Sequence, residues 1–310
     1  MRIMVIAPFT HRYDSSSVRA RPTGGTEKAA AFLAEAMRQL GHAVELVTTW
    51  AEVDLLDRAW PEVVVTQHAE LFPRFDRAIA KVWWCHQFTD RPFVWEAAKH
   101  VRRHATAVVT LSEFQQRDFA ERLGLESVVI GLGVWRDEVS RAPKVPGRMI
   151  YTSVPQRGLE AVPVIFDAIR AAYPEATLTV CSSLAPWGLA EQDRGFDALF
   201  DRLRRLEGVT LTAALAQAAL YAELAAAVVF FYPATYQETF CVAMAEAMAH
   251  GCVPVVPDIG ALPERWVPTQ RLVHRAVHEL RQFERRARQV RAPPDWMEVA
   301  EQWDCLLCDL

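Results

Sequence analysis

The 310-residue sequence lacks several features that would place it in a specialised class. Its formal net charge of −4 gives no support for nucleic-acid binding, which normally goes with a basic excess. No apolar run approaches the roughly 20 residues of a membrane span. The opening stretch, MRIMVIAPFTHRYD, has one basic residue before a short apolar segment, and no small-residue cleavage site follows. We therefore expect a first strand there rather than a secretory signal.

Cysteine is sparse and lies mostly within apolar stretches. This pattern predicts reduced, buried thiols in a cytoplasmic protein. The last two form a CxxC pair, but no second pair exists, so neither a metal site nor a redox site is predicted there. The six are Cys85, Cys181, Cys241, Cys252, Cys305 and Cys308.

What the sequence does contain is an alternation of short apolar runs and helical patterns. The runs are continuous and β-branched, which predicts parallel strands covered on both faces. Between them lie segments such as TEKAAAFLAEAMRQLGH, with apolar residues at helical spacing and Gly41 as a stop. Repeated units of this kind predict an α/β, doubly wound fold. The runs are IMVIAP, AVELVTT, EVVVTQ, KVWWCH, AVVTLS, SVVIGLG, RMIYTS, ATLTVCSS, GVTLT, AAVVFFYP and CVPVVP.

A change of composition in VSRAPKVPGRM, residues 139–149, predicts a domain boundary. We expect an N-terminal Rossmann-like domain over residues 1–143 and a second over 144–293. The amphipathic segment 294–310 could pack back on the first domain. The Arg-rich stretch 271–291 is most simply a solvated helix face, and contact with an anionic membrane surface is the alternative.

A glycine pair in RPTGGTEKAAAF, Gly24 and Gly25, precedes the first predicted helix. Backbone amides at a helix N-terminus bind phosphate readily, although an ordinary turn explains the pair equally well. The segment is neither a GxGxxG fingerprint nor a P-loop.

Arg157, in YTSVPQRGLEAV, follows the first strand of the second predicted domain. Open α/β sheets bind ligands at the carboxyl ends of their strands, and a guanidinium there can bind phosphate bidentately. The alternative is a surface arginine without such a role.

Two glutamates stand in the apolar stretch PATYQETFCVAMAEAMAHGCVPVV. We expect a helix from Glu238 to the stop at Gly251, with Glu238 at its entrance and Glu246 two turns deeper. Glu238 could merely complement the helix dipole, and Glu246 could form a salt bridge beneath a loop. A buried carboxylate needs a partner, which is either internal or a ligand.

These residues carry a family resemblance. The segment 233–264, PATYQETFCVAMAEAMAHGCVPVVPDIGALPE, resembles the signature of retaining glycosyltransferase family 4: a Glu, seven residues and a second Glu, followed by a glycine and a Pro-Val-Val strand. The resemblance extends to GGTE, LGHAVELVT, TAVVTLSEFQQRDF and MIYTSVPQRGLEAV, and so covers most of the chain. It implies the GT-B fold, in which two Rossmann-like doubly wound domains face each other across a cleft.

The resemblance also implies roles for individual residues. Glu246 would hold the ribose of a nucleotide-sugar donor, and Glu238 the hydroxyls of its sugar. Arg157 would neutralise the leaving diphosphate, and Gly25 would approach that diphosphate from the other domain. His86, in WWCHQF, would reach the donor sugar, or else it is a buried structural histidine. The remaining donor-binding positions are Gly24, Ser153, Phe240, Cys241 and Val242.

Three departures from the family pattern stand out. Thr152 occupies the position of a usual arginine, so Arg157 works alone or another cation, such as Arg148, replaces it. Cys241 occupies the position of a usual glycine, which would narrow the sugar pocket. The chain is also short after Glu264.

The resulting hypothesis is a cytoplasmic retaining transferase of glycan biosynthesis, with a carbohydrate, lipid-linked or small-molecule acceptor and no nucleic-acid partner. The sequence has no DxD-type motif between the domains, so metal-independent catalysis without a cofactor is expected. Alternatives are a nucleotide-sugar epimerase, a phosphorylase, or a non-catalytic protein that binds nucleotide sugars. A phosphorylase would need a pyridoxal-type lysine, and the sequence has only four lysines.

Overall fold

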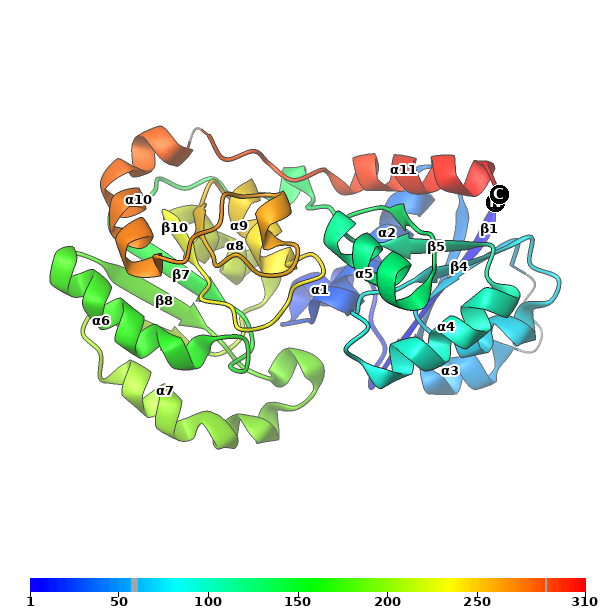
Figure 1. Cartoon of the computed structure of the whole chain (residues 1–310), viewed down its shortest axis with the longest axis horizontal. Helices are drawn as coiled ribbons and strands as arrows, with labels where there is room; N and C mark the ends of the chain where they lie inside the picture. Colours follow the sequence, from blue (N-terminus) through cyan, green and yellow to red (C-terminus); the bar gives the residue numbers. More distant parts are fainter. Residues whose placement is uncertain (57–60, 288) are drawn as a thin grey trace. The chain divides into compact units, whose positions relative to one another are not determined.

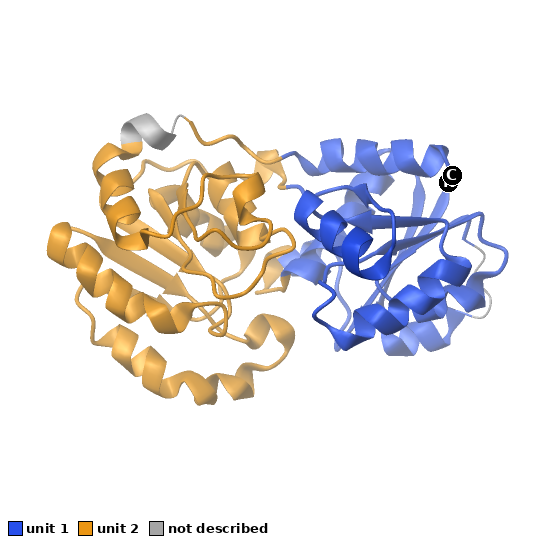
Figure 2. Cartoon of the chain, viewed as in Figure 1, with its two compact units in different colours: residues 1–18, 25–133, 294–310 blue, residues 19–24, 134–293 orange. Residues whose placement is uncertain are grey.

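A computed structural model describes residues 1–56, 61–287 and 289–310. The chain divides into two compact units (Figure 2): unit 1 comprises residues 1–18, 25–133 and 294–310, and unit 2 comprises 19–24 and 134–293. The main change of unit therefore falls at 133/134 rather than at the expected 143/144. Residues 134–143 go with unit 2 because they bond to it: the Ser140 amide donates to His250 Nε2 over 3.2 Å, and Gln217 Nε2 donates to Glu138 Oε2 over 2.6 Å.

The core of unit 1 is a parallel six-stranded sheet in the described part of the chain, with the order β2-β1-β3-β4-β5-β6 (Figure 1). Each apolar run predicted for the first half overlaps one of its strands. The strands are β1 (Arg2–Phe9), β2 (Ala43–Thr49), β3 (Val63–Thr66), β4 (Ala80–Trp84), β5 (Ala107–Thr110) and β6 (Val128–Val129).

Helices flank this sheet, and the C-terminal helix of the chain is one of them. They are α1 (Ser15–Ala20, which runs into unit 2), α2 (Gly25–Gln39), α3 (Trp50–Asp54), η2 (Ala69–Phe75), α4 (Pro92–His104), α5 (Glu113–Leu123) and α11 (Trp296–Cys308). Helix α11 lies on unit 1 through two buried tryptophans. Trp296 contacts Phe32 of α2 with ring centroids 6.0 Å apart, and Trp303 contacts Trp84 of β4 at 5.4 Å.

The same helix corrects the expectation that all six cysteines are buried. Four of them are buried, whereas Cys305 and Cys308 are exposed, and all six are free thiols. The reason is helical periodicity: α11 buries Trp296, Trp303 and their neighbours, which leaves the CxxC pair on the other face.

Unit 2 has a parallel five-stranded sheet in its described residues, with the order β11-β10-β7-β8-β9. Its strands fall in the predicted runs of the second half. They are β7 (Arg148–Thr152), β8 (Thr177–Cys181), β9 (Val209–Thr212), β10 (Val229–Phe231) and β11 (Val253–Val255).

The helical segments of unit 2 include one that departs from expectation. They are η3 (Arg136–Glu138), η4 (Leu159–Ala161), α6 (Val162–Ala172), η5 (Ala185–Trp187), η6 (Ala190–Phe196), α7 (Asp197–Arg204), α8 (Gln217–Ala226), α9 (Val242–Ala249), η7 (Leu262–Glu264) and α10 (Leu272–Ala287). The Arg-rich stretch forms α10, but this helix is not simply solvated: Ala276 and Leu280 are in the core, and buried Glu279 pairs with Arg275 at 2.7 Å. The side chains of 284–288 lie outside the described part. None of the described helices has the length and apolar character needed to cross a bilayer.

Strand order locates a ligand-binding edge in unit 2. The chain runs from β7 outward to β8 and β9, then returns to place β10 on the other side of β7. Neighbouring strands whose connections leave in opposite directions open a crevice at their carboxyl ends, where α/β proteins bind ligands. In unit 2 this switch point lies between β7 and β10.

Candidate functional site

The segments that follow β7 and β10 carry the charged residues singled out in the sequence. β7 ends at Thr152 and leads into the loop with Ser153 and Arg157, while β10 ends at Phe231 and leads into the loop with Glu238. Gly158 brings the loops together. It has φ +99°, and a Cβ on it would lie 2.1 Å from the Pro233 carbonyl oxygen, so only glycine fits there without a shift.

Glu238 is not at a helix entrance, which corrects the sequence-based expectation. Helix α9 begins at Val242, and Glu238 belongs to the preceding loop. A later segment of the chain holds this loop in place: the Ala261 amide donates to the Glu238 carbonyl over 2.8 Å. Gly260 is so close that a Cβ on it would lie 2.5 Å from the Glu238 nitrogen. Glu238 therefore does not act as a first-turn charge on the α9 dipole.

The Glu238 carboxylate is buried and has two internal partners. Arg157 Nη1 lies 3.0 Å from Glu238 Oε1, and the Tyr232 hydroxyl donates to the same oxygen over 2.6 Å. The two charged residues come from the two sides of the switch point, so the structure brings Arg157 and Glu238 into direct contact. Tyr232, which supplies the second bond, was not identified from the sequence.

The Arg157 guanidinium is held by aromatic rings as well as by charge. Its Cζ lies 4.6 Å from the centre of the Tyr236 ring and 5.8 Å from that of Trp187. Burial alone would lower the pKa of Arg157, but the Glu238 carboxylate and neighbouring tyrosines raise it. Arg157 is thus a permanent cation, and only one of its nitrogens, Nη1, bonds to Glu238.

Helix α9 opens from an unusual backbone conformation. Cys241, at its N-cap, has φ +67° and ψ 78°, a left-handed conformation that glycine adopts much more easily than cysteine. The positive φ explains why the helix starts at Val242 and why the resemblance places glycine here. Burial raises the pKa of the Cys241 thiol, which therefore stays protonated. The first-turn amides of α9 have no acceptor within the helix, which makes this end of the helix suitable for an anion.

Glu246 lies inside α9 and is 4% exposed. The Tyr221 hydroxyl donates to Glu246 Oε1 over 3.3 Å, and the Tyr221 ring lies 4.5 Å from that of His250. The Glu246 carbonyl in turn lies 2.7 Å from His250 Nδ1. Glu246 thus has an internal partner in a tyrosine that the sequence did not single out.

Two hydroxyls at the carboxyl edge of the sheet are buried without any hydrogen-bond partner in the described part of the chain. They are Thr152 Oγ1, at the end of β7, and Ser182 Oγ, just after β8. Buried polar groups are normally paired, so these two hydroxyls are candidates for hydrogen bonds to a ligand.

The other predicted cation, Arg148, is in the wrong place to replace an arginine at position 152. It begins β7 at the amino end and pairs with Glu223. At about 3.3 Å per residue, it lies some 13 Å along the strand from Thr152. Arg148 therefore does not reach the switch-point edge.

Two predicted site residues belong to unit 1. His86 follows β4, is 7% exposed and packs against Trp84 with ring centroids 4.4 Å apart. Burial lowers its pKa to about 3, so the ring is neutral near pH 7. Gly25 is exposed and opens α2, whereas Gly24 belongs to unit 2.

The backbone around His86 is positioned by Gln115, a residue not identified from the sequence. Gln115 Nε2 donates to the Cys85 and Gln87 carbonyls, each over 2.9 Å. Its Oε1 accepts from the Leu111 amide over 2.8 Å. This fully buried amide ties α5 to the segment on both sides of His86.

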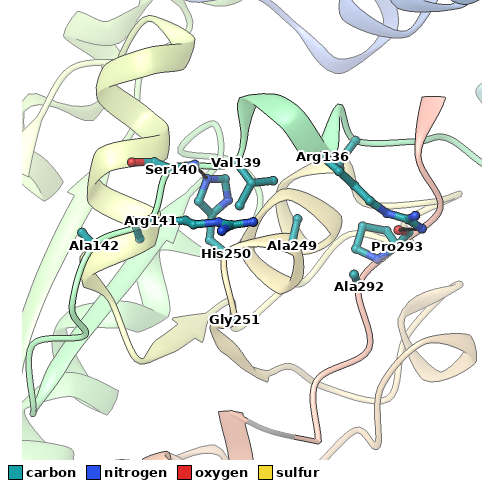
Figure 3. A pocket seen from close by; sticks show the side chains of 12 residues that line it. Arg136, Val139, Ser140, Arg141, Ala142, Ala249, His250, Gly251, Ala292 and Pro293 are labelled. Atoms are coloured by element: carbon teal, nitrogen blue, oxygen red, sulfur yellow. Dashed lines mark hydrogen bonds between the residues drawn. The ribbon is translucent and has the colours of Figure 1, made fainter. Parts of the chain in front are cut away.

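A pocket of about 460 Å³ lies at the other end of α9, at its C-terminus (Figure 3). None of the site residues predicted from the sequence, all of which the structure describes, lines it. Its lining includes Arg136, Arg141 and His250, whose ring lies near Ser140. The pocket is therefore distinct from the switch-point site.

Comparison with known proteins finds a family match over less than half of the chain. Residues 146–282 match the family described as Glycosyl transferases group 1. This segment covers most of unit 2 and includes Arg157, Glu238 and Glu246. No curated protein matches the chain.

Several solved structures share the fold along the whole chain. Alr3699/HepE of Anabaena, solved in complex with UDP and glucose, has a TM-score of 0.72 at 15% identity, with 100% of both chains covered. Sucrose-phosphate synthase from Thermosynechococcus elongatus has a TM-score of 0.73 at 14% identity, covering 99% of this chain and 98% of its own. The catalytic domain of Starch Synthase IV from Arabidopsis thaliana, bound to ADP and acarbose, has a TM-score of 0.69 at 13% identity, with 98% of both chains covered.

The two parallel sheets and these neighbours confirm the predicted GT-B fold with Rossmann-like domains. Together with the family match over unit 2, the findings support a glycosyltransferase, an enzyme of class EC 2.4.

Proposed function

We propose that the protein is a retaining, metal-independent glycosyltransferase that moves a sugar from a nucleoside-diphosphate sugar to an acceptor hydroxyl. The observation that carries the proposal is the buried Glu238, joined to Arg157 across the switch point just before the N-terminus of α9. This arrangement combines a cation, a helix N-terminus and a carboxylate, which suit a diphosphate and the hydroxyls of a sugar. The HepE complexes with UDP and with UDP-glucose support a donor of this class.

Each residue has a role in this proposal. Glu246 accepts hydrogen bonds from the donor ribose, and Glu238 accepts from hydroxyls of the sugar. The α9 amides and Arg157 bind the diphosphate. Arg157 can serve Glu238 and phosphate together, because its pairing with Glu238 uses Nη1 and leaves Nε and Nη2 available.

The chemical step follows from where charge develops. The bond between the anomeric carbon and the phosphate oxygen breaks with its electron pair on the phosphate, and the acceptor oxygen bonds to the same face of that carbon. The acceptor proton passes to a phosphate oxygen. Charge therefore grows on the diphosphate, where preorganised amides and a guanidinium stabilise it best.

The test combines binding and product analysis. Thermal-shift screening against UDP-, GDP-, ADP- and TDP-sugars identifies the donor, because a ligand of the native state raises its stability. With that donor and a panel of carbohydrate, lipid-linked and small-molecule acceptors, proton NMR of the fresh product reads the anomeric configuration. We expect retention and full activity in EDTA.

Each part of the proposal has its own contrary outcome. An inverted anomer would contradict retention, and loss of activity in EDTA that added metal restores would contradict metal independence. Conversion of the donor alone would indicate an epimerase. Donor binding without turnover across the whole panel would indicate a non-catalytic binding protein.

A further inference from the structure

Arg265 is a cation that forms no hydrogen bond through two of its nitrogens within the described part of the chain. It follows η7, and its Cζ lies 3.8 Å from the centre of the Phe240 ring. Its Nε and Nη2 atoms are buried and have no hydrogen-bond partner in the described part of the chain. A buried charge without a hydrogen-bonded partner is costly, so its presence needs an explanation.

The surroundings of Arg265 make the unpaired charge more costly still. Phe240 immediately precedes Cys241, the N-cap of α9, so the guanidinium lies beside the positive end of a helix dipole. Burial lowers the pKa of Arg265, while Cys241, Glu264 and Glu238 oppose this shift. An anion that bonds to both the guanidinium and the helix N-terminus would pair the free donors of Arg265 and offset its repulsion by the helix dipole.

We infer that Arg265 binds the diphosphate of the donor and supplies the cation that Thr152 cannot. This inference rests on the proposed function for the identity of the anion, whereas the geometry alone requires only an anion with several acceptor oxygens. Arg148 is excluded by its pairing at the opposite end of β7. Arg157 and Arg265 then form a pair of cations, one anchored to Glu238 and the other stacked on Phe240.

The stacking explains how an unpaired guanidinium stays in place without a ligand. A ring face attracts a cation and fixes the plane of the guanidinium without using its N–H donors. Arg265 is therefore preorganised, with buried donors that are ready for phosphate oxygens. Ligand binding then costs little side-chain entropy.

The experiment compares Arg265→Gln, Arg265→Lys and the control Arg271→Gln, an exposed arginine nearby in the chain. Calorimetric titration measures binding of UDP, GDP, ADP, inorganic pyrophosphate and the matching nucleosides. We expect Arg265→Gln to weaken binding of the preferred nucleoside diphosphate and of pyrophosphate by roughly tenfold or more, with nucleoside binding unchanged. Arg265→Lys should recover part of this loss, and Arg271→Gln should match the wild type.

Thermal unfolding without ligand separates this role from a structural one. Since Arg265→Gln removes a buried unpaired charge, its melting temperature should equal or exceed that of the wild type. A large drop in melting temperature, or unchanged pyrophosphate and diphosphate affinity, would overturn the inference while leaving the proposed function intact. If the wild type bound pyrophosphate through Arg265 but bound no nucleoside diphosphate, the anion site would stand and the proposed function would fall. Absence of binding to every phosphate probe would overturn both.

Discussion

The carboxyl edges of the two sheets treat buried titratable groups in opposite ways. In unit 2, Arg157 and Glu238 form an ion pair 3.0 Å long at the switch point, and the carboxylate raises the pKa of Arg157. In unit 1, burial drives groups toward their neutral forms: it raises the pKa of Glu27, in the first turn of α2, to about 7 and lowers that of His86 to about 3. The difference indicates that unit 2 is arranged to act on charge, whereas the buried groups of unit 1 present neutral polar surfaces.

The largest expected effect comes from removing Arg157 from the charged edge, that is, the carboxyl edge of the unit 2 sheet with Arg157 and Glu238. Arg157→Ala should lower turnover by about 10²–10³-fold, roughly 3–4 kcal/mol of transition-state stabilisation. Arg157→Lys should recover part of it, because lysine keeps the charge but not the planar fork. Steady-state kinetics with the donor identified by screening measures both.

Arg157→Ala also leaves Glu238 buried beside Tyr232 without its cation, so it should lower stability as well. The double variant Arg157→Ala with Glu238→Gln separates the two effects: it should regain stability but not turnover. Near wild-type turnover in folded Arg157→Ala would remove Arg157 from the reaction.

The variant Glu27→Gln tests whether burial keeps Glu27 of unit 1 neutral. The folded state keeps a proton on Glu27 up to about pH 7, whereas an ordinary glutamate releases it near 4.5. Stability should therefore fall as pH rises between these values, and the penalty is complete above pH 7. Glu27→Gln should raise the free energy of unfolding at pH 8 by on the order of 3 kcal/mol, and by much less at pH 5.

Urea unfolding at the two pH values measures this difference, with exposed Glu45→Gln in the same unit as the control. Equal effects of Glu27→Gln at both pH values would show that Glu27 is ionised in the folded state. For His86 the pH dependence of stability has the opposite sign. Its lowered pKa favours the folded state above pH 6.5, and this contribution is lost as pH falls toward 3.

A third variant asks whether Glu246 belongs to the charged edge. Glu246→Ala should weaken binding of the cognate donor about tenfold or more, because ribose hydroxyls lose bonds to a charged acceptor worth about 1.5–3 kcal/mol. Tyr221→Phe is the matched control, since it removes only the internal bond to Glu246. Calorimetric titration of folded Glu246→Ala with unchanged affinity would place the ribose elsewhere.

The smallest expected effect concerns the backbone at Cys241. Alanine and glycine both remove the thiol, but glycine accepts φ +67° without strain. Cys241→Gly should therefore be more stable than Cys241→Ala by about 1 kcal/mol, the reverse of their order within a helix. Thermal melts of the two variants decide this, and a more stable alanine variant would show that the left-handed conformation carries no cost.

The sequence predicted the strands well because each buried parallel strand is a continuous apolar run that depends little on distant residues. It placed the start of α9 wrongly because that start depends on the positive φ of Cys241 and on contacts with Gly260 and Ala261, which lie beyond the helix. For the same reason it could locate Arg157 and Glu238 at strand ends but could not pair them.

The partners that complete the candidate site were missed for a related reason. Tyr232 lies in a strand run and Tyr221 in an ordinary helix, so only their positions in space connect them with the two glutamates. Arg265 stands in an irregular segment after η7, with no periodicity to mark it. Its distance in sequence from Phe240 gave no signal either, because α9, β11 and η7 lie between the two residues.

The position of α11 has a consequence for synthesis on the ribosome. Residues 294–310 complete unit 1, yet they emerge only after the whole of residues 134–293 has been translated. At about 5–20 residues per second, Phe32 and Trp84 wait for Trp296 and Trp303 for roughly ten seconds or more. During this interval unit 2 can fold first, while the nascent first unit leaves the rings of Phe32 and Trp84 without the tryptophans that cover them.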